Sequence, residues 1–153
     1  MMAGRDTNDE DRRKGEVSFI RIEDVTPVPI GNVTVAHDQG WSRNLVSTQA
    51  CGSPDLLMSN FRMDPFQHHP LHTHDNVGEI YFILEGRARL QVGDRVEWVE
   101  KHTTAYIPAG TQHGIDTGPD PVSVLIVFPE GDFGNVHKRF VEPDAEPIRP
   151  PGE

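Results

Sequence analysis

The residues best suited to chemistry gather in one stretch, which begins at His72 and ends at a glycine, Gly86. His72 and His74 stand two residues apart, and Glu79 follows five residues later. Side chains two residues apart on an extended backbone point to the same face, so both imidazoles would face one way. Two imidazoles and a carboxylate suit a first-row divalent metal if a fourth ligand arrives from another segment. His113 is the natural candidate for that ligand.

The segments that must position these residues have the pattern of short strands. Glu79 opens a strongly apolar run that is typical of a buried strand, and turn signals recur about every eight to twelve residues, which predicts an all-β sandwich or barrel. A loop is expected over Asp64–Pro70, and a short helix over Asn135–Phe140. The predicted strands are Val17–Ile22, Val33–Ala36, Arg43–Gln49, Leu56–Met63, Glu79–Glu85, Arg87–Val92, Arg95–Val99, Thr104–Ile107 and Val122–Phe128.

The chain divides by composition into one folded domain and two tails. Residues 1–15 are polar and charged, which predicts a disordered tail. Residues 141–153 carry four prolines among acidic residues, which predicts a loosely attached second tail. We therefore expect a single β-barrel domain over residues 16–140.

Charge and cysteine content limit the classes of partner and compartment. The formal charge of −10 at pH 7 weighs against nucleic acid or an anionic membrane as the principal partner. The longest apolar runs are too short to span a bilayer, and the first residues lack the apolar core of a secretory signal. A single cysteine, Cys51, excludes an intramolecular disulfide and suits a reducing compartment. A cytoplasmic location is the expectation.

Two motifs around these residues resemble those of a known superfamily. His72-x-His74-x4-Glu79-x6-Gly86 is similar to the first motif of the cupins, and Pro108-x-Gly110-x2-His113 is similar to the second, with a predicted hairpin between them. The resemblance covers about residues 43–128. It implies a double-stranded β-helix, or jelly roll, whose interior binds a metal.

By this resemblance the metal ligands are His72, His74, Glu79 and His113. Such a His₃Glu set suits Fe(II), Ni(II), Mn(II), Cu(II) or Zn(II), and the ligands alone do not select among them. One carboxylate leaves a divalent site with net positive charge, which favours an anionic or oxygen-bearing ligand.

The chain departs from the cupin motifs at three positions. Phe66 and His102 stand where a glycine usually opens each motif, and Thr117 stands where an asparagine often ends the second. None of the three is a metal ligand, so the departures concern the loops.

Other side chains are candidates for a role beside the metal. Tyr81 shares the interior face with Glu79, either as a catalytic hydrogen-bond donor or acid/base, or as a core aromatic. Arg43, Asn60 and Arg62 are candidates to line the substrate site, since an arginine there would bind a carboxylate; surface positions are the alternative. His68 and His69 are interpreted as solvated loop residues, with proton transfer at the mouth as the alternative.

Three function classes fit these residues and the resemblance. The first is a metal-dependent dioxygenase acting on a small organic, carboxylate-bearing molecule, which the four-ligand set favours. The second is an isomerase, epimerase, cyclase or lyase that uses the metal as a Lewis acid. The third is a module that binds a small ligand without turnover. The resemblance also implies a homodimer, with Val17–Ile22 as a strand to exchange.

Overall fold

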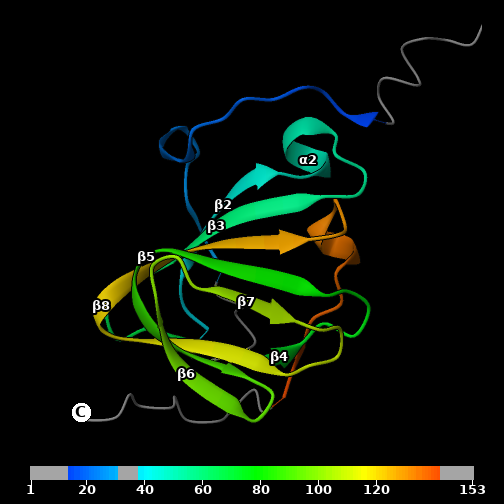
Figure 1. Ribbon diagram of the computed structural model, residues 1–153. Helices are drawn as coiled ribbons and strands as arrows, with labels where there is room; N and C mark the ends of the chain where they lie inside the picture. The colour runs from blue at the N-terminus through cyan, green and yellow to red at the C-terminus, as the bar shows by residue number, and fades with distance from the viewer. Residues whose placement is uncertain (1–13, 31–37, 142–153) are drawn as a thin grey trace, which may run out of the picture.

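The protein is an antiparallel β-structure curled into a barrel (Figure 1). The computed structural model describes residues 14–30 and 38–141. Its elements are η1 (Ile22–Asp24), β1 (Val28–Pro29), β2 (Trp41–Val46), α2 (Thr48–Cys51), β3 (Leu57–Met63), β4 (His68–Thr73), β5 (Glu79–Val92), β6 (Arg95–Glu100), β7 (Thr104–Ile107), β8 (His113–Phe128), η2 (Phe133–Asn135) and β9 (Arg139–Phe140).

The two longest strands, β5 and β8, form the central pair of the barrel. They pair antiparallel from Ile80↔Val127 to Val92↔His113. The second half of β8 pairs with β3 on its other edge, whereas its first residues pair with β4. β8 therefore brings the strands of both halves of the sheet together, and its first residue, His113, lies opposite His72 of β4.

Gly86 marks the bend of β5. Its φ is +84°, and a Cβ there would lie 1.8 Å from the carbonyl oxygen of Pro121. The β5–β8 register shifts on either side of this glycine. The turn predicted at Gly86 is therefore a bend within one strand, and the two predicted strands that flank it are the continuous β5.

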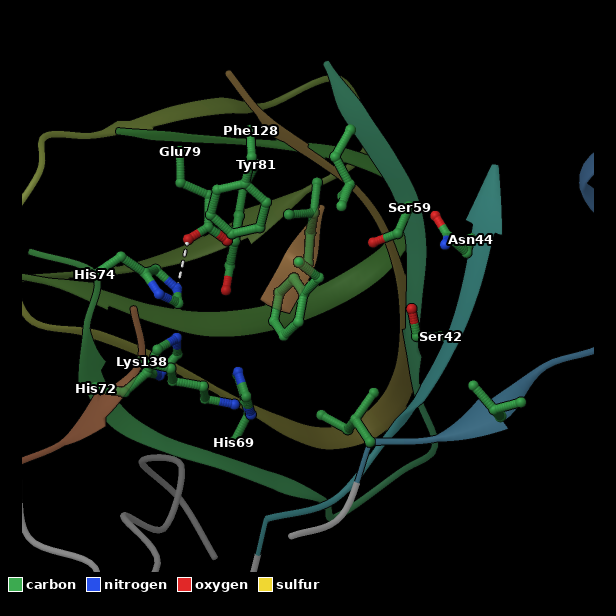
Figure 2. A pocket seen from close by; sticks show the side chains of 15 residues that line it. Ser42, Asn44, Ser59, His69, His72, His74, Glu79, Tyr81, Phe128 and Lys138 are labelled. Atoms are coloured by element: carbon green, nitrogen blue, oxygen red, sulfur yellow. Dashed lines mark ion pairs between the residues drawn. The ribbon is translucent and has the colours of Figure 1, made fainter. Parts of the chain in front are cut away.

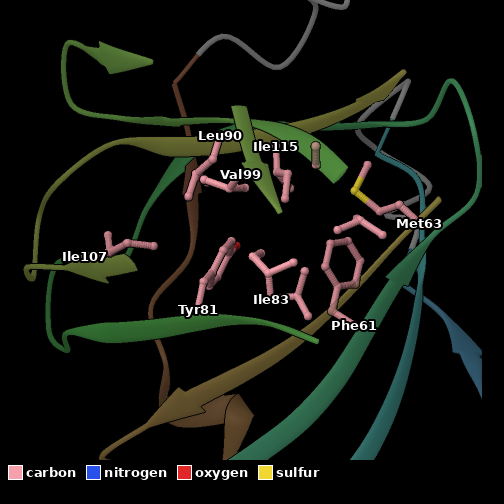
Figure 3. Close-up of a cluster of buried hydrophobic side chains, with 11 residues drawn as sticks. Phe61, Met63, Tyr81, Ile83, Leu90, Val99, Ile107 and Ile115 are labelled. Atoms are coloured by element: carbon pink, nitrogen blue, oxygen red, sulfur yellow. The ribbon is translucent and has the colours of Figure 1, made fainter. Parts of the chain in front are cut away.

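The barrel interior is filled by alternate residues of β5 and the strands around it (Figure 3). Tyr81 and Ile83 are each 1% exposed, and Ile115 of β8 is fully buried. Burying an apolar side chain of this size contributes on the order of 1.5–3 kcal/mol. The alternation that predicted Tyr81 on the interior face is present in the structure.

The all-β, cupin-like architecture is confirmed, and several predicted elements need correction. Residues 17–21 lie outside the sheet as the structure describes it and are followed by η1. Residues 135–140, predicted as a helix, lie at the end of η2 and in β9. Three residues of the predicted loop, His68–Pro70, belong to β4. The predicted strand Val33–Ala36 falls outside the described residues, as do the tails except 14, 15 and 141.

A short helix, α2, follows β2 where the sequence predicted a continued strand. Ser47 caps it, since its hydroxyl accepts a hydrogen bond from the Ala50 backbone N–H at 2.9 Å. Gly52 ends it with φ +75°. Four residues are too few to show helical periodicity, so only these two caps mark α2 in the sequence. Across the described part of the chain, no helix has the length and apolar character needed to cross a membrane.

Candidate metal centre

Four buried side chains meet at one end of the barrel interior, and Figure 2 shows His72, His74 and Glu79 among them. His72 lies in β4, His74 just beyond it, Glu79 begins β5 and His113 begins β8. Each offers one ligand atom, and these atoms all lie within 4.8 Å of one another. The same oxygen of Glu79, Oε2, is 3.2 Å from Nε2 of His74 and 3.1 Å from Nε2 of His113. The structure thus brings together the four predicted ligands.

The three imidazoles are oriented by backbone carbonyls. The Nδ1 atoms of His72, His74 and His113 lie 2.8, 2.8 and 2.9 Å from the carbonyl oxygens of Pro70, His137 and Thr111. A carbonyl only accepts, so each Nδ1 carries the proton and each Nε2 presents a lone pair. Such outer hydrogen bonds are what orient histidine ligands around metals.

The ionisation of the cluster matches what a divalent cation needs. Burial lowers the pKa of His72 well below its ordinary value, so this ring is neutral at pH 7. Burial alone would raise the pKa of Glu79, but the imidazoles of His113 and His74 beside it outweigh burial and the pKa is lowered. Imidazole nitrogens and an ionised carboxylate form the donor set of a transition-metal site, and the residues present therefore fit such an ion.

A cavity of about 320 Å³ opens beside the cluster. Most of its wall is apolar, and a smaller polar part lies across from the histidines, on β2 and β3 (Figure 2). The lining residues are Val28, Ile30, Ser42, Asn44, Leu57, Ser59, His69, His72, His74, Glu79, Tyr81, Ile126, Phe128, Phe133 and Lys138.

Tyr81 lies both in the core and at the wall of this cavity. Its ring packs edge-on against that of His113, with centroids 6.0 Å apart. Burial, followed by the negative charges of Glu79 and Asp38, raises the pKa of Tyr81 well above its ordinary value. The hydroxyl therefore stays protonated, so it can donate a hydrogen bond but is a poor base.

Arg43, Asn60 and Arg62 line a different cavity on the opposite face of β2 and β3. There the Asn60 side-chain amide donates to the Ser123 hydroxyl at 2.8 Å, and Arg43 donates to the Val25 carbonyl at 2.9 Å. Neighbouring positions on a strand face opposite sides, so the cavity beside the cluster receives Ser42, Asn44 and Ser59 instead. Arg43, Asn60 and Arg62 therefore point away from the cavity beside the cluster, and their neighbours along β2 and β3 point into it.

His68 and His69 are both buried, not solvated as interpreted from the sequence. His69 lines the cavity, and its Nδ1 lies 2.6 Å from Oδ1 of Asp38. His68 faces away and forms an ion pair with Asp116. Because the strand β4 includes the predicted loop, both rings are covered by the sheet and its connections.

Two charged residues were not predicted from the sequence: Lys138, which lines the cavity, and Asp38, whose carboxylate contacts His69 and Lys138. Asp38 stands 34 residues before His72, and Lys138 stands 25 residues after His113. Neither belongs to a motif with a metal-ligand spacing, so no local pattern identifies them.

Comparisons with known proteins agree with this geometry. A family model described as Cupin domain matches residues 59–128. The polyketide cyclase RemF from Streptomyces resistomycificus superposes with a TM-score of 0.70 at 25% identity, covering 83% of this chain and 87% of that one.

Two curated proteins are also similar in sequence. An oxalate-binding protein from Thermotoga maritima is 23% identical over 76% of this chain and 97% of its own length. An uncharacterised Streptomyces coelicolor protein is 36% identical over 33% of this chain, and the match spans about half (48%) of that protein. The matched motifs, the barrel and the His₃Glu cluster establish the chain as a member of the cupin superfamily.

Proposed function

We propose that the protein is a metal-dependent enzyme that converts a small, largely apolar organic molecule by non-redox, Lewis-acid chemistry on a carbonyl group. The observation that carries this proposal is the cavity itself. About 320 Å³ of mostly apolar space adjoins the His₃Glu cluster, which suits a substrate of one to a few rings or an equivalent acyl chain.

The similarity to a polyketide cyclase supports the same reading. Oxalate, which the name of the Thermotoga protein mentions, has no apolar surface to bury against the aliphatic and aromatic wall of this cavity. A cyclisation or isomerisation through an enolate fits an apolar substrate with a few carbonyl oxygens better.

The side chains divide the work between binding and proton transfer. A divalent cation held by His72, His74, Glu79 and His113 would supply Lewis acidity toward a carbonyl oxygen. The protonated hydroxyl of Tyr81 is placed at the cavity wall to donate to an oxygen on which negative charge develops. The apolar wall keeps water from a reactive enolate.

A dioxygenase, the function that the sequence favoured first, is the second candidate. The observation that favours it is that the cavity adjoins the four ligands, which would leave a six-coordinate ion with positions for substrate and oxygen. The two candidates differ in their need for oxygen.

Oxygen dependence is the experiment that separates them. The probes are 1,3-dicarbonyl compounds with aryl or alkyl substituents, incubated in D₂O with protein loaded with Zn(II) or Fe(II). We expect the protein to accelerate exchange of the α-protons, followed by NMR, above the rate without protein, equally with and without oxygen, and this acceleration to be lost in His113→Ala. Substrate loss only in oxygen, with matching oxygen uptake, would establish the dioxygenase, and no acceleration with any probe would contradict enolate chemistry.

Tyr81→Phe tests the role of the hydroxyl in the same assay. If the hydroxyl only packs, exchange is unchanged. If it donates to the developing enolate, the rate falls by about tenfold to a thousandfold while the metal content stays constant.

We also propose that the protein is a homodimer. Val17 and Phe19 are 92% and 97% exposed, which is unusual for two large apolar side chains so close in sequence. Their segment is attached to the domain at its start, where the Glu16 N–H donates to the Cys51 carbonyl at 2.8 Å. A second copy of the chain is the partner that would cover them.

A further inference from the structure

Lys138 brings a positive charge to a largely apolar cavity. It follows η2 and precedes β9, and its side chain is 24% exposed. Among the described residues that line the cavity, Lys138 is the only lysine or arginine. Figure 2 shows its ammonium group beside His69 and close to His72. A cation at this point would attract negative charge on a ligand bound between the His₃Glu cluster and the apolar wall.

The position of Lys138 is fixed by the chain on both sides of it. The preceding residue, His137, accepts the hydrogen bond from His74 Nδ1 through its carbonyl, and its N–H donates to Oδ1 of Asn76 at 3.0 Å. The following strand β9 pairs with Thr73 and His72 of β4. The backbone that carries Lys138 is therefore tied to the same two histidines that belong to the cluster.

The ammonium group has an ionic partner but keeps its donors. Nζ lies 3.7 Å from Oδ2 of Asp38, which is longer than a hydrogen bond, and 4.8 Å from the ring centroid of Phe140. Asp38 uses its other oxygen for His69, and Oδ2 has no hydrogen-bond partner among the described residues. Because the ammonium is too far from this oxygen for a hydrogen bond, the N–H donors of Lys138 are left for a group in the cavity.

The charges around the cavity favour an anion as that group. A divalent cation with Glu79 would carry a net charge of +1, and Lys138 and Asp38 balance each other. The Asp38 side chain is fully buried, whereas Lys138 faces the cavity, so the exposed part of the pair is the positive one. The apolar wall lowers the local dielectric constant, which strengthens the attraction.

We propose that Lys138 is a specificity-determining residue that binds a carboxylate of the substrate while another oxygen of the same molecule reaches the His₃Glu cluster. This inference rests on the proposed function, because it names the substrate class of the same site: an apolar acid that also bears a carbonyl. Two anchoring points would fix the orientation of a substrate whose remaining surface meets only apolar side chains.

The test measures the preference of the Zn(II)-loaded protein for 2-naphthoate over 2-naphthamide, which have the same shape and differ in charge. Dissociation constants are compared for the wild type, Lys138→Met, Lys138→Arg and the double variant Lys138→Met/Asp38→Asn. The double variant removes both charges, so Asp38 is not left unpaired. Arg139→Met, which changes the same net charge at the exposed neighbouring position, is the matched control.

We expect the wild type and Arg139→Met to prefer the carboxylate by about tenfold, the size of one charge-assisted hydrogen bond. The preference should fall to about twofold or less in both Lys138→Met variants and be partly kept in Lys138→Arg. A wild type without preference, or a double variant that keeps it, would overturn the role of Lys138. Since these probes are not turned over, a wild type that shows α-proton exchange but no preference for the carboxylate contradicts the role of Lys138 alone. A wild type that shows the preference but no exchange contradicts the proposed function alone.

Discussion

Phe66 and His102 adopt a backbone conformation that glycine normally occupies. Their φ angles are +58° and +71°, and no other non-glycine residue in the described part of the chain has a positive φ. These are the two positions where the chain departs from the glycines of the cupin motifs. The loops have therefore kept the left-handed conformation although the residue type changed, at a cost of roughly 1–2 kcal/mol per residue.

Replacing Phe66 by glycine should relieve this strain. Phe66 is 61% exposed, so little packing is lost, and we expect the free energy of unfolding to rise by about 0.5–1 kcal/mol. Thermal or urea denaturation measures the change. Leu56→Gly is the control, because Leu56 is 55% exposed but lacks a positive φ; it should destabilise the protein. A Phe66→Gly variant that is also destabilised would show that the loop is not strained.

Thr117, the third departure, has a structural role. Its hydroxyl donates to the Asp64 carbonyl at 2.6 Å and accepts from the Gln67 N–H at 2.8 Å, so it ties the loop before β4 to β8. A hydroxyl thus provides both a donor and an acceptor for this loop at a fully buried position.

At the scale of elements, the bend of the paired strands β5 and β8 at Gly86 determines the shape of the barrel. Only a residue without a side chain fits where the Pro121 carbonyl approaches, and both strands continue past this point to the cluster. Glu79 and His113 are at the starts of these two strands, so the bend affects where both lie.

Gly86→Ala should therefore cost on the order of 3 kcal/mol or more, since a clash adds to the left-handed φ. Gly110→Ala is a matched control: its φ is +81°, but nothing lies within 4 Å of the Cβ it would gain. Urea denaturation should show a loss of only about 1 kcal/mol for the control. Equal losses in the two variants would mean that the close approach to Pro121 does not matter.

The secondary-structure predictions were wrong where contacts with distant segments determine the conformation of the chain. Pro70 favoured a loop, yet β4 tolerates it because the register of β4 and β8 is interrupted between His69 and His72. Residues 17–22 have a strand-like pattern but have no neighbouring strand within the described chain. By contrast, Thr104–Ile107 was predicted with its observed bounds, and Pro108 and Gly110 mark the turn that follows it.

At the scale of the whole molecule, the spacing of His72, His74 and Glu79 predicted a site that distant segments complete. His113 was identifiable because it belongs to a second motif. Asp38 and Lys138 come together only after the chain folds. The alternation of residue types along β2 does not determine which of two neighbouring residues points into the cavity, because that depends on the pairing register with β3.

The exposed segment around Phe19 gives a prediction about assembly. If a second copy covers it, Val17→Ser/Phe19→Ser should shift the protein from dimer to monomer in sedimentation velocity at micromolar concentration. Tyr106→Ser, which removes another side chain that is 67% exposed, should leave the assembly unchanged. A wild-type protein that sediments as a monomer would contradict the proposal.

The metal content of the purified protein tests the central claim most directly. We predict about one divalent ion per chain by elemental analysis in the wild type and in His102→Ala, whose histidine lies outside the cluster. His113→Ala and Glu79→Gln should each lose the ion while keeping a cooperative thermal transition. If the folded His113→Ala protein retains the wild-type metal content, the His₃Glu cluster is not the metal site.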